Sequence, residues 1–182
     1  MGSRSSPTVT VPHLVSAIAA LLLARGETLG VAESSTGGLI AHWITGLPGA
    51  SDWFLGGVIA YHNRVKTELL DAPATLFARG NASASGTVSS ATARALALGA
   101  RRRLRCDWAV AETGLAGTHP GRSRKPIGLS FMAVAGPGEA GDDQSRVWEA
   151  KHQFEGDRSA NKAAAAQAAL SLLHQALVKA GG

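Results

Sequence analysis

Apolar residues along this chain recur at two different spacings, and the changes between them predict an alternation of helices and strands. Leu14, Ile18, Leu21 and Leu22 follow the interval of a helix that Gly26 ends. Runs of consecutive apolar residues between polar or glycine-containing turns predict buried strands instead. By these criteria helices are predicted at 12–25, 35–45, 63–70, 73–79, 88–104 and 157–180, and strands at 28–32, 53–61, 107–113, 128–135 and 146–154.

The order of these elements indicates the fold class. Helices interspersed with strands are typical of a sheet that carries helices on both faces. A turn at 136–143 predicts that the last two strands form a hairpin, which adds an antiparallel pair to the sheet. Two glycine-containing segments, 80–86 and 114–126, are predicted loops. We therefore expect an α/β fold with three layers, α/β/α, around a mixed, mostly parallel sheet.

Length and composition favour one globular domain. The 182 residues suffice for a single sizeable core, and 45% of them are hydrophobic against 17% charged. We expect residues 12–182 to form that domain and residues 1–11 to be disordered or left from cloning. Cys106 has no second cysteine to pair with, and its apolar neighbours predict a buried thiol. No apolar run reaches the length of a membrane span, so we expect no membrane partner and a cytoplasmic protein.

The net charge of +5 raises the question of an acidic partner. Nucleic-acid binding usually combines basic clusters with stacking aromatic rings, but aromatic residues make up 5% of the chain and do not interleave with Arg101–Arg105. Those arginines fall at the end of a predicted helix, where cations complement the helix dipole. A small anionic ligand therefore fits the charge better than nucleic acid. The six histidines lack metal-ligand spacing, so no metal is expected.

Candidate chemistry follows the first two predicted strands. Ser34 comes directly after the first strand, at the start of a predicted helix, where unpaired backbone N–H groups favour an anion or an oxyanion. Tyr61, Asn63 and Lys66 come directly after the second. A lysine close to the serine could accept the hydroxyl proton, as in hydrolases that work without a histidine.

Each of these residues also has a structural interpretation. Ser34 or Ser35 could be a helix N-cap and nothing more. Lys66 could be a solvated lysine on a helix surface, and Glu33 could be either a contributor to the site or a charge at the end of a strand. Arg158 could bind a phosphate, or it could form a surface ion pair with a neighbouring carboxylate.

Short motifs in this chain resemble those of the CinA C-terminal domain family, which includes the nicotinamide-nucleotide amidohydrolases. The motifs occur in the family's order and extend from about residue 12 to about residue 179. They are Ala32-Glu-Ser-Ser-Thr-Gly-Gly38, Pro48-Gly-Ala-Ser51, Phe54 to Tyr61-x-Asn63-x-x-Lys66, Thr113-Gly-Leu-Ala-Gly117, Lys125-Pro-Ile-Gly128 and Gly156-Asp-Arg158.

The resemblance implies a three-layer α/β/α domain that hydrolyses the amide of nicotinamide mononucleotide to nicotinate mononucleotide and ammonia. It implies a small-molecule nucleotide substrate, no cofactor and a homo-oligomer. Ser34 and Lys66 match the family's Ser-Lys pair, and Tyr61 lies beside them as a third catalytic residue. The residues expected to contact the substrate are Glu33, Ser35, Thr36, Gly37, Gly38, Asn63, Thr113, Gly114 and Arg158.

Three departures from the family's pattern leave alternatives open. Ser35 stands where a cysteine is common, the segment Gly86–Ala91 lacks the family's acidic pair, and residues 118–124 replace a loop usually rich in proline and glycine. The alternatives are a catalytically weak relative that binds a nucleotide or a protein, and a protein associated with competence or DNA damage. The retained Ser34, Tyr61 and Lys66 favour the enzyme.

Overall fold

The structure, a computed structural model, describes residues 10–78, 86–117, 125–138 and 145–181. The helices are α1 (Val11–Arg25), α2 (Leu39–Thr45), α3 (Asn63–Leu70), α4 (Ser90–Leu104) and α5 (Arg158–Ala180). The strands are β1 (Leu29–Glu33), β2 (Phe54–Ile59), β3 (Trp108–Gly114), β4 (Leu129–Gly136) and β5 (Arg146–Gln153), with short 3-10 segments η1 (Ala50–Asp52) and η2 (Ala74–Phe77).

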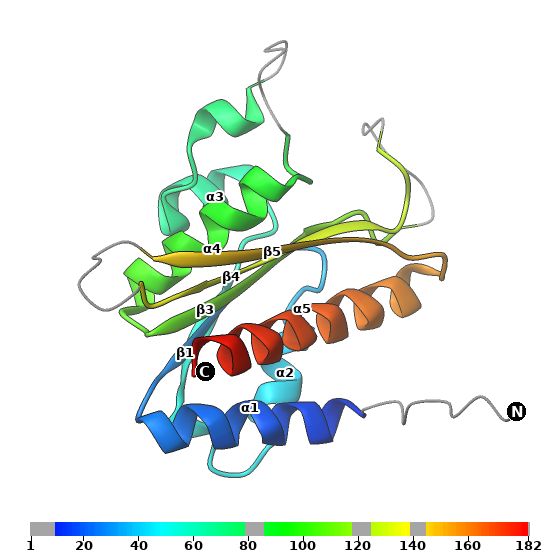
Figure 1. Ribbon diagram of the computed structural model, residues 1–182. Coiled ribbons are helices and arrows are strands. Elements are labelled where there is room, and N and C mark those ends of the chain that lie inside the picture. The colour runs from blue at the N-terminus through cyan, green and yellow to red at the C-terminus, as the bar shows by residue number, and fades with distance from the viewer. Residues whose placement is uncertain (1–9, 79–85, 118–124, 139–144, 182) are drawn as a thin grey trace, which may run out of the picture.

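The five strands form one mixed sheet in the order β2-β1-β3-β4-β5 (Figure 1). β1 lies parallel to both β2 and β3, whereas β4 is antiparallel to β3 and to β5. Among the described strands, therefore, only β4 runs against the common direction. The predicted mixed, mostly parallel sheet and the predicted pairing of the last two strands are confirmed.

Helices cover both faces of this sheet, which confirms the three layers (Figure 1). α1, α2 and α5 pack on one face, and α3 and α4 lie on the other. The core is divided accordingly. Leu22, Val31, Trp108 and Leu170 belong to the larger buried cluster on the α5 side, and Leu96 belongs to the smaller cluster on the α4 side. Side chains on successive strand residues point to opposite faces, so each strand contributes to both clusters.

Two predictions about the elements need correction. The segment 53–61 was predicted to be a buried strand, but β2 is the edge strand of the sheet, with Leu55 and Ile59 about half exposed. The first helix, predicted to begin at Pro12, begins one residue earlier, at Val11. A continuous apolar run indicates a strand but does not say whether that strand lies in the centre of the sheet or at its edge.

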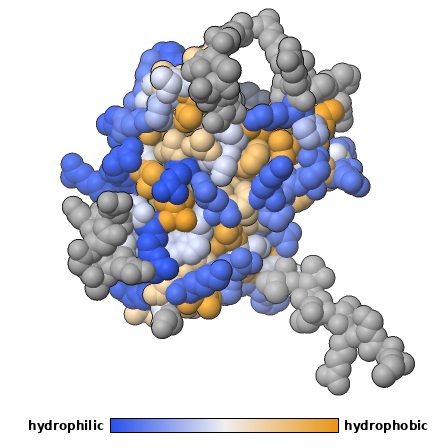
Figure 2. Space-filling view, turned by 45° about the horizontal axis from the view of Figure 1, so that its top comes forward, coloured by the Kyte–Doolittle hydropathy of each residue, from blue (hydrophilic) through white to orange (hydrophobic). Residues whose placement is uncertain are grey.

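Other predictions hold, or lie outside the described residues. Cys106 is buried, and burial raises the pKa of its thiol to about 11. No described helix has the length and apolar character needed to span a bilayer. On the face that Figure 2 shows, hydrophobic side chains lie among hydrophilic ones. Most residues of the predicted loops at 80–86 and 114–126 and of the predicted turn at 136–143 lie outside the described residues.

Close packing of α4 against the end of α3 depends on Gly99. A Cβ atom at this position would lie 1.9 Å from the carbonyl oxygen of Leu70, the last residue of α3. The helices can approach this closely only because glycine has no side chain. Since α3 also carries Lys66, this contact helps to set the distance of Lys66 from the sheet.

We therefore predict that Gly99→Ala lowers the free energy of unfolding by about 1–3 kcal/mol, the usual cost of overpacking a core. Chemical denaturation monitored by circular dichroism measures it. Arg94→Ala is the control, because Arg94 is exposed on the same helix and its loss should change stability by less than about 0.5 kcal/mol. Equal stability of the Gly99→Ala variant and the wild type would show that α3 and α4 can separate without cost.

Candidate active site

The candidate site forms where β1 and β2 end side by side. Because the two strands are parallel, their carboxyl ends meet at the same edge of the sheet, a common location for binding sites in α/β folds. The chain leaves β1 through Ser34 toward α2 and leaves β2 through Ala60 and Tyr61 toward α3. His62 caps α3 by accepting a hydrogen bond from the Arg64 N–H, and Lys66 lies one turn into the helix.

Ser34 and Lys66 are in direct contact at this edge. The Lys66 Nζ donates a hydrogen bond to the Ser34 Oγ at 3.0 Å, and it also donates to the carbonyl oxygens of Ala60 at 2.5 Å and Tyr61 at 3.0 Å. The Lys66 side chain is fully buried, and Ser34 is 6% exposed. The interpretation of Lys66 as a solvated surface lysine is therefore wrong.

Burial makes the Lys66 amine easier to deprotonate. Loss of hydration lowers its pKa from 10.5 to about 8, although the Glu112 carboxylate opposes this change because its charge favours the ammonium form. At a pKa near 8, an appreciable fraction of the amine is neutral at neutral pH. A neutral amine 3.0 Å from a serine hydroxyl can accept its proton.

The helix after Ser34 begins later than predicted. We expected a helix from Ser35, but α2 starts at Leu39, after Gly37 and Gly38 adopt φ angles of 64° and 99°. Such positive φ values suit glycine and end any helical path from Ser34. Ser34 therefore lies in a turn before the helix and is not its N-cap.

Glu33, which we expected to contact the substrate, has its carboxylate at the start of α2. The carboxylate is buried and accepts hydrogen bonds from the backbone N–H groups of Gly38, Ile40 and Ala41 at 2.9–3.1 Å. It thereby satisfies N–H groups that have no partner within the helix, and its charge complements the helix dipole. Its observed contacts tie the turn that follows Ser34 to the helix.

The backbone N–H groups of Ser35 through Gly38, which follow Ser34 along the chain, are the potential donors of an oxyanion hole. Of these, the Thr36 N–H donates to Glu112 and the Gly38 N–H donates to Glu33. The candidates are therefore the N–H groups of Ser35 and Gly37.

Sequence reasoning missed Glu112, which lies in β3 and is fully buried. Its carboxylate accepts hydrogen bonds from the hydroxyls of Ser35 at 2.5 Å, Ser130 at 2.8 Å and Thr36 at 3.3 Å, and from the Thr36 N–H at 3.1 Å. A Cβ atom on Gly114 would lie 2.8 Å from this cluster. Burial raises the pKa of Glu112 above its ordinary value, although the hydrogen bonds to the carboxylate oppose this change. A lone carboxylate in an apolar strand was the available signal.

Tyr61 does not place its phenol against Lys66. Its side chain is 64% exposed, and its hydroxyl accepts a hydrogen bond from the Arg158 guanidinium at 3.3 Å. Its main-chain carbonyl, not its ring, contacts the Lys66 amine. The structure therefore joins Tyr61 to Arg158 at the exposed rim, and proton relay through the phenol would require the side chain to move.

The remaining predicted contacts lie on the α4 side of the sheet or at the start of α5. Thr87 connects Asn63 to Thr113, because its hydroxyl donates to the Asn63 Oδ1 at 2.9 Å and its carbonyl accepts from the Thr113 hydroxyl at 2.8 Å. Arg158 is exposed as the first residue of α5, which Asp157 caps. On the same helix, the Lys162 Nζ lies 3.3 Å from where a Cβ of Gly37 would be.

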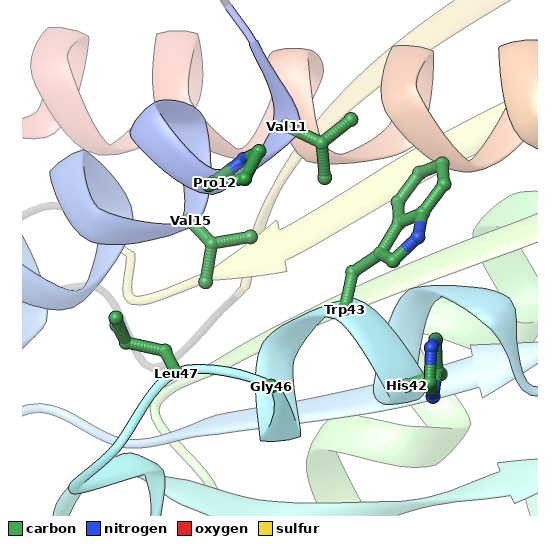
Figure 3. Close-up of a pocket in the computed structure, with 7 residues that line it drawn as sticks. All are labelled: Val11, Pro12, Val15, His42, Trp43, Gly46 and Leu47. Atoms are coloured by element: carbon green, nitrogen blue, oxygen red, sulfur yellow. The ribbon is translucent and has the colours of Figure 1, made fainter.

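A separate groove between α1 and α2 lacks this chemistry (Figure 3). It has a volume of about 260 Å³. Its lining residues are Val11, Pro12, Val15, His42, Trp43, Gly46 and Leu47. Elsewhere, among the residues that the structure describes, no group of three or more His, Cys, Asp and Glu side chains could hold a metal ion.

Comparison with known proteins agrees with the motifs around the site. The family model of the CinA C-terminal domain matches residues 12–177 of this chain. The chain belongs to the CinA C-terminal domain family. A CinA-like protein of Synechococcus sp. strain RCC307 is 47% identical over 142 residues, which cover 74% of this chain and 33% of the relative. One from Gloeobacter violaceus is 42% identical over 165 residues, which cover 91% of this chain and 36% of the relative.

Solved structures share the fold along the whole domain. The competence/damage inducible protein CihA of Agrobacterium tumefaciens superposes with a TM-score of 0.80 at 31% identity, covering 95% of this chain and 98% of that one. A CinA superfamily protein of Klebsiella pneumoniae gives a TM-score of 0.82 at 26% identity, covering 94% and 99%. This chain spans about a third of the length of the longer relatives above, so their full activities do not transfer to it.

The buried amine leads to a prediction about stability. Lys66 has a pKa of about 8 in the folded chain and about 10.5 when exposed, so between these values the unfolded chain binds the proton that the folded chain has released. The free energy of unfolding of the wild type should therefore rise relative to that of Lys66→Met from pH 8 to pH 10.5, by on the order of 3 kcal/mol.

Urea denaturation at several pH values measures this difference. Lys179→Met is the control, because Lys179 is exposed at the end of α5 and should show no such dependence. A constant difference between the wild type and Lys66→Met would mean that the Lys66 amine keeps its ordinary pKa.

Proposed function

We propose that this domain hydrolyses the carboxamide of nicotinamide mononucleotide to nicotinate mononucleotide and ammonia, with Ser34 as nucleophile and Lys66 as base. The observation that carries the proposal is the buried hydrogen bond of 3.0 Å between the Lys66 Nζ and the Ser34 Oγ. Membership of the CinA C-terminal domain family supports it. A lysine buried beside a serine has a chemical purpose in an amidase that it lacks in a passive binding protein.

In the acylation step, the Ser34 Oγ attacks the carboxamide carbon while the neutral Lys66 amine takes the hydroxyl proton. The carbonyl oxygen becomes an oxyanion, for which the N–H groups of Ser35 and Gly37 are the candidate donors. The tetrahedral intermediate then collapses, and the Lys66 ammonium returns the proton to the departing nitrogen. Ammonia leaves, and an ester of Ser34 remains.

In the second step, water hydrolyses the ester. The Lys66 amine, again neutral, takes a proton from the water as it attacks the ester carbon. The Ser34 Oγ leaves and recovers its proton from Lys66. One water is consumed for each amide, and the products are a carboxylic acid and ammonia. The carbonyl oxygens of Ala60 and Tyr61 keep the Lys66 amine in place through both steps.

In the proposed mode of binding, the phosphate of the substrate contacts Arg158 at the exposed rim of the site. Arg158 is exposed at the start of α5 and is already oriented toward Tyr61. A guanidinium can bind a phosphate through two parallel hydrogen bonds. In this pose the nicotinamide lies toward Ser34 and the phosphate toward α5.

Ser34→Ala should abolish the release of ammonia from nicotinamide mononucleotide, because it removes the nucleophile and leaves the Ala60 and Tyr61 carbonyls bound to Lys66. Ser35→Ala should retain most of the activity, since the Thr36 N–H still connects the segment to Glu112. A coupled ammonia assay on the purified proteins measures both. An active Ser34→Ala variant beside an inactive Ser35→Ala variant would move the nucleophile by one residue.

Arg158→Ala should raise KM for the mononucleotide by about 10- to 100-fold, since a hydrogen bond to a charged group contributes about 1.5–3 kcal/mol. KM for the riboside, which lacks the phosphate, should change much less. Arg64→Ala is the control, because Arg64 is exposed on α3 and pairs with Glu68. Equal increases in KM for the two substrates would assign Arg158 a structural role.

A further inference from the structure

The side chains of residues 33–35 point alternately to the two faces of the sheet. Val31 packs in the cluster on the α5 side and Ala32 in the cluster on the α4 side, and this alternation continues past the end of β1. Glu33 and Ser35 follow Val31, whereas Ser34 follows Ala32 and meets Lys66 of α3. The nucleophile therefore faces one layer while both its neighbours are held in the other.

Both neighbours are anchored by carboxylates. The carboxylate of Glu33 accepts hydrogen bonds from backbone N–H groups at the start of α2. Ser35 donates to the carboxylate of Glu112 at 2.5 Å, and the next residue, Thr36, adds its N–H to the same carboxylate at 3.1 Å. The backbone that carries Ser34 is thus held on both sides, and Glu112 supplies one of the two anchors.

Glu112 is itself fixed to the rest of the sheet. It belongs to β3, which pairs with β1 on one side and β4 on the other, and Ser130 of β4 donates to its carboxylate at 2.8 Å. The position of Gly114, where a Cβ would lie 2.8 Å from the Glu112, Ser130 and Ser35 oxygens, shows how tightly this cluster is packed. Nothing in the mechanism above uses this carboxylate.

We propose that Glu112 is a positioning residue for the Ser34–Lys66 pair: its carboxylate fixes the Ser35–Thr36 backbone to the centre of the sheet and so holds the Ser34 Oγ against the Lys66 amine. The proposal rests on the proposed function, because it assigns Glu112 a part in the reactivity of Ser34. Glu112 acts from the opposite face of the sheet and does not touch the substrate.

The length and the charge of the Glu112 side chain should affect the reaction in different ways. The length matters because it sets the position of Ser34, and a nucleophile displaced by about 1 Å can lose on the order of 100-fold in rate. Charge matters because a carboxylate near Lys66 favours the ammonium over the neutral amine. Within the part of the chain that the structure describes, the other charged groups around the segment include Glu33 on β1 and Arg158 and Lys162 on α5.

Two substitutions separate these contributions. Glu112→Gln keeps the reach and removes the charge, because its amide oxygen can accept from the Thr36 N–H while the Ser35 and Ser130 hydroxyls turn to accept from its NH₂ group. Glu112→Asp keeps the charge but is one methylene shorter, so it cannot contact Ser35, Thr36 and Ser130 together. Ser130→Ala is the control, because it removes a partner of the carboxylate without altering residues 34–36.

The experiment measures ammonia release against pH, together with the rate at which a fluorophosphonate labels Ser34. In the labelling reaction the Ser34 Oγ bonds to phosphorus, fluoride leaves, and the serine proton passes to Lys66. We expect Glu112→Asp to lower kcat and the labelling rate at least about tenfold, with KM changed less than about threefold. Glu112→Gln should keep the plateau rate within about threefold and move the acid limb of both profiles to lower pH by about half a unit or more.

Wild-type rates and pH profiles in both Glu112 variants would overturn the proposal. So would equal losses in Ser130→Ala and Glu112→Asp, which would show that the cluster only supports the fold. Thermal melting of each variant shows whether it is folded at the assay temperature, and if Glu112→Asp is not, its kcat and labelling rate are compared with those of the wild type at a lower temperature at which it is folded. A wild type that is labelled at Ser34 but releases no ammonia refutes the proposed function and still tests Glu112. A wild type that neither releases ammonia nor is labelled refutes both.

Discussion

The rest of the structure depends on the burial of one amine among oxygen atoms. Lys66 is the only lysine among the described residues that is fully buried, and its Nζ meets the Ser34 hydroxyl and the carbonyls of Ala60 and Tyr61. Taking an ammonium out of water is costly unless hydrogen bonds compensate for its hydration. The three oxygens supply that compensation only while β1, β2 and α3 keep their relative positions, so this contact ties the fold to its chemistry.

Parallel strands explain how residues 32 positions apart come to share one site. β1 and β2 end at the same edge of the sheet, and their chains leave toward opposite faces. Ser34 arrives from one strand and Lys66 from the helix after the other. The close approach of α3 and α4 at Gly99 then limits how far Lys66 can move from the sheet.

Two buried carboxylates divide the support of the nucleophile between them. Glu33 holds the turn after Ser34 to α2, and Glu112 holds the two residues after Ser34 to β3 and β4. Neither faces solvent, and both bind groups that would otherwise be buried without a partner. Hydrogen bonds from backbone N–H groups and hydroxyls to these two carboxylates therefore fix the position of Ser34, which a mobile loop could not do.

The sequence alone determined the order of the elements, the mixed sheet and the three layers, because these follow from local apolar spacing. The pairing of Ser34 with Lys66 was an expectation from the resemblance to a known family, and the structure supplies their contact. Only the tertiary structure decided that α2 starts at Leu39, that Tyr61 lies with Arg158, and that Glu112 supports the segment after Ser34. The physical reason is distance along the chain: Glu112 and its partners Ser35 and Ser130 come from three separate segments, and no local pattern specifies that they meet.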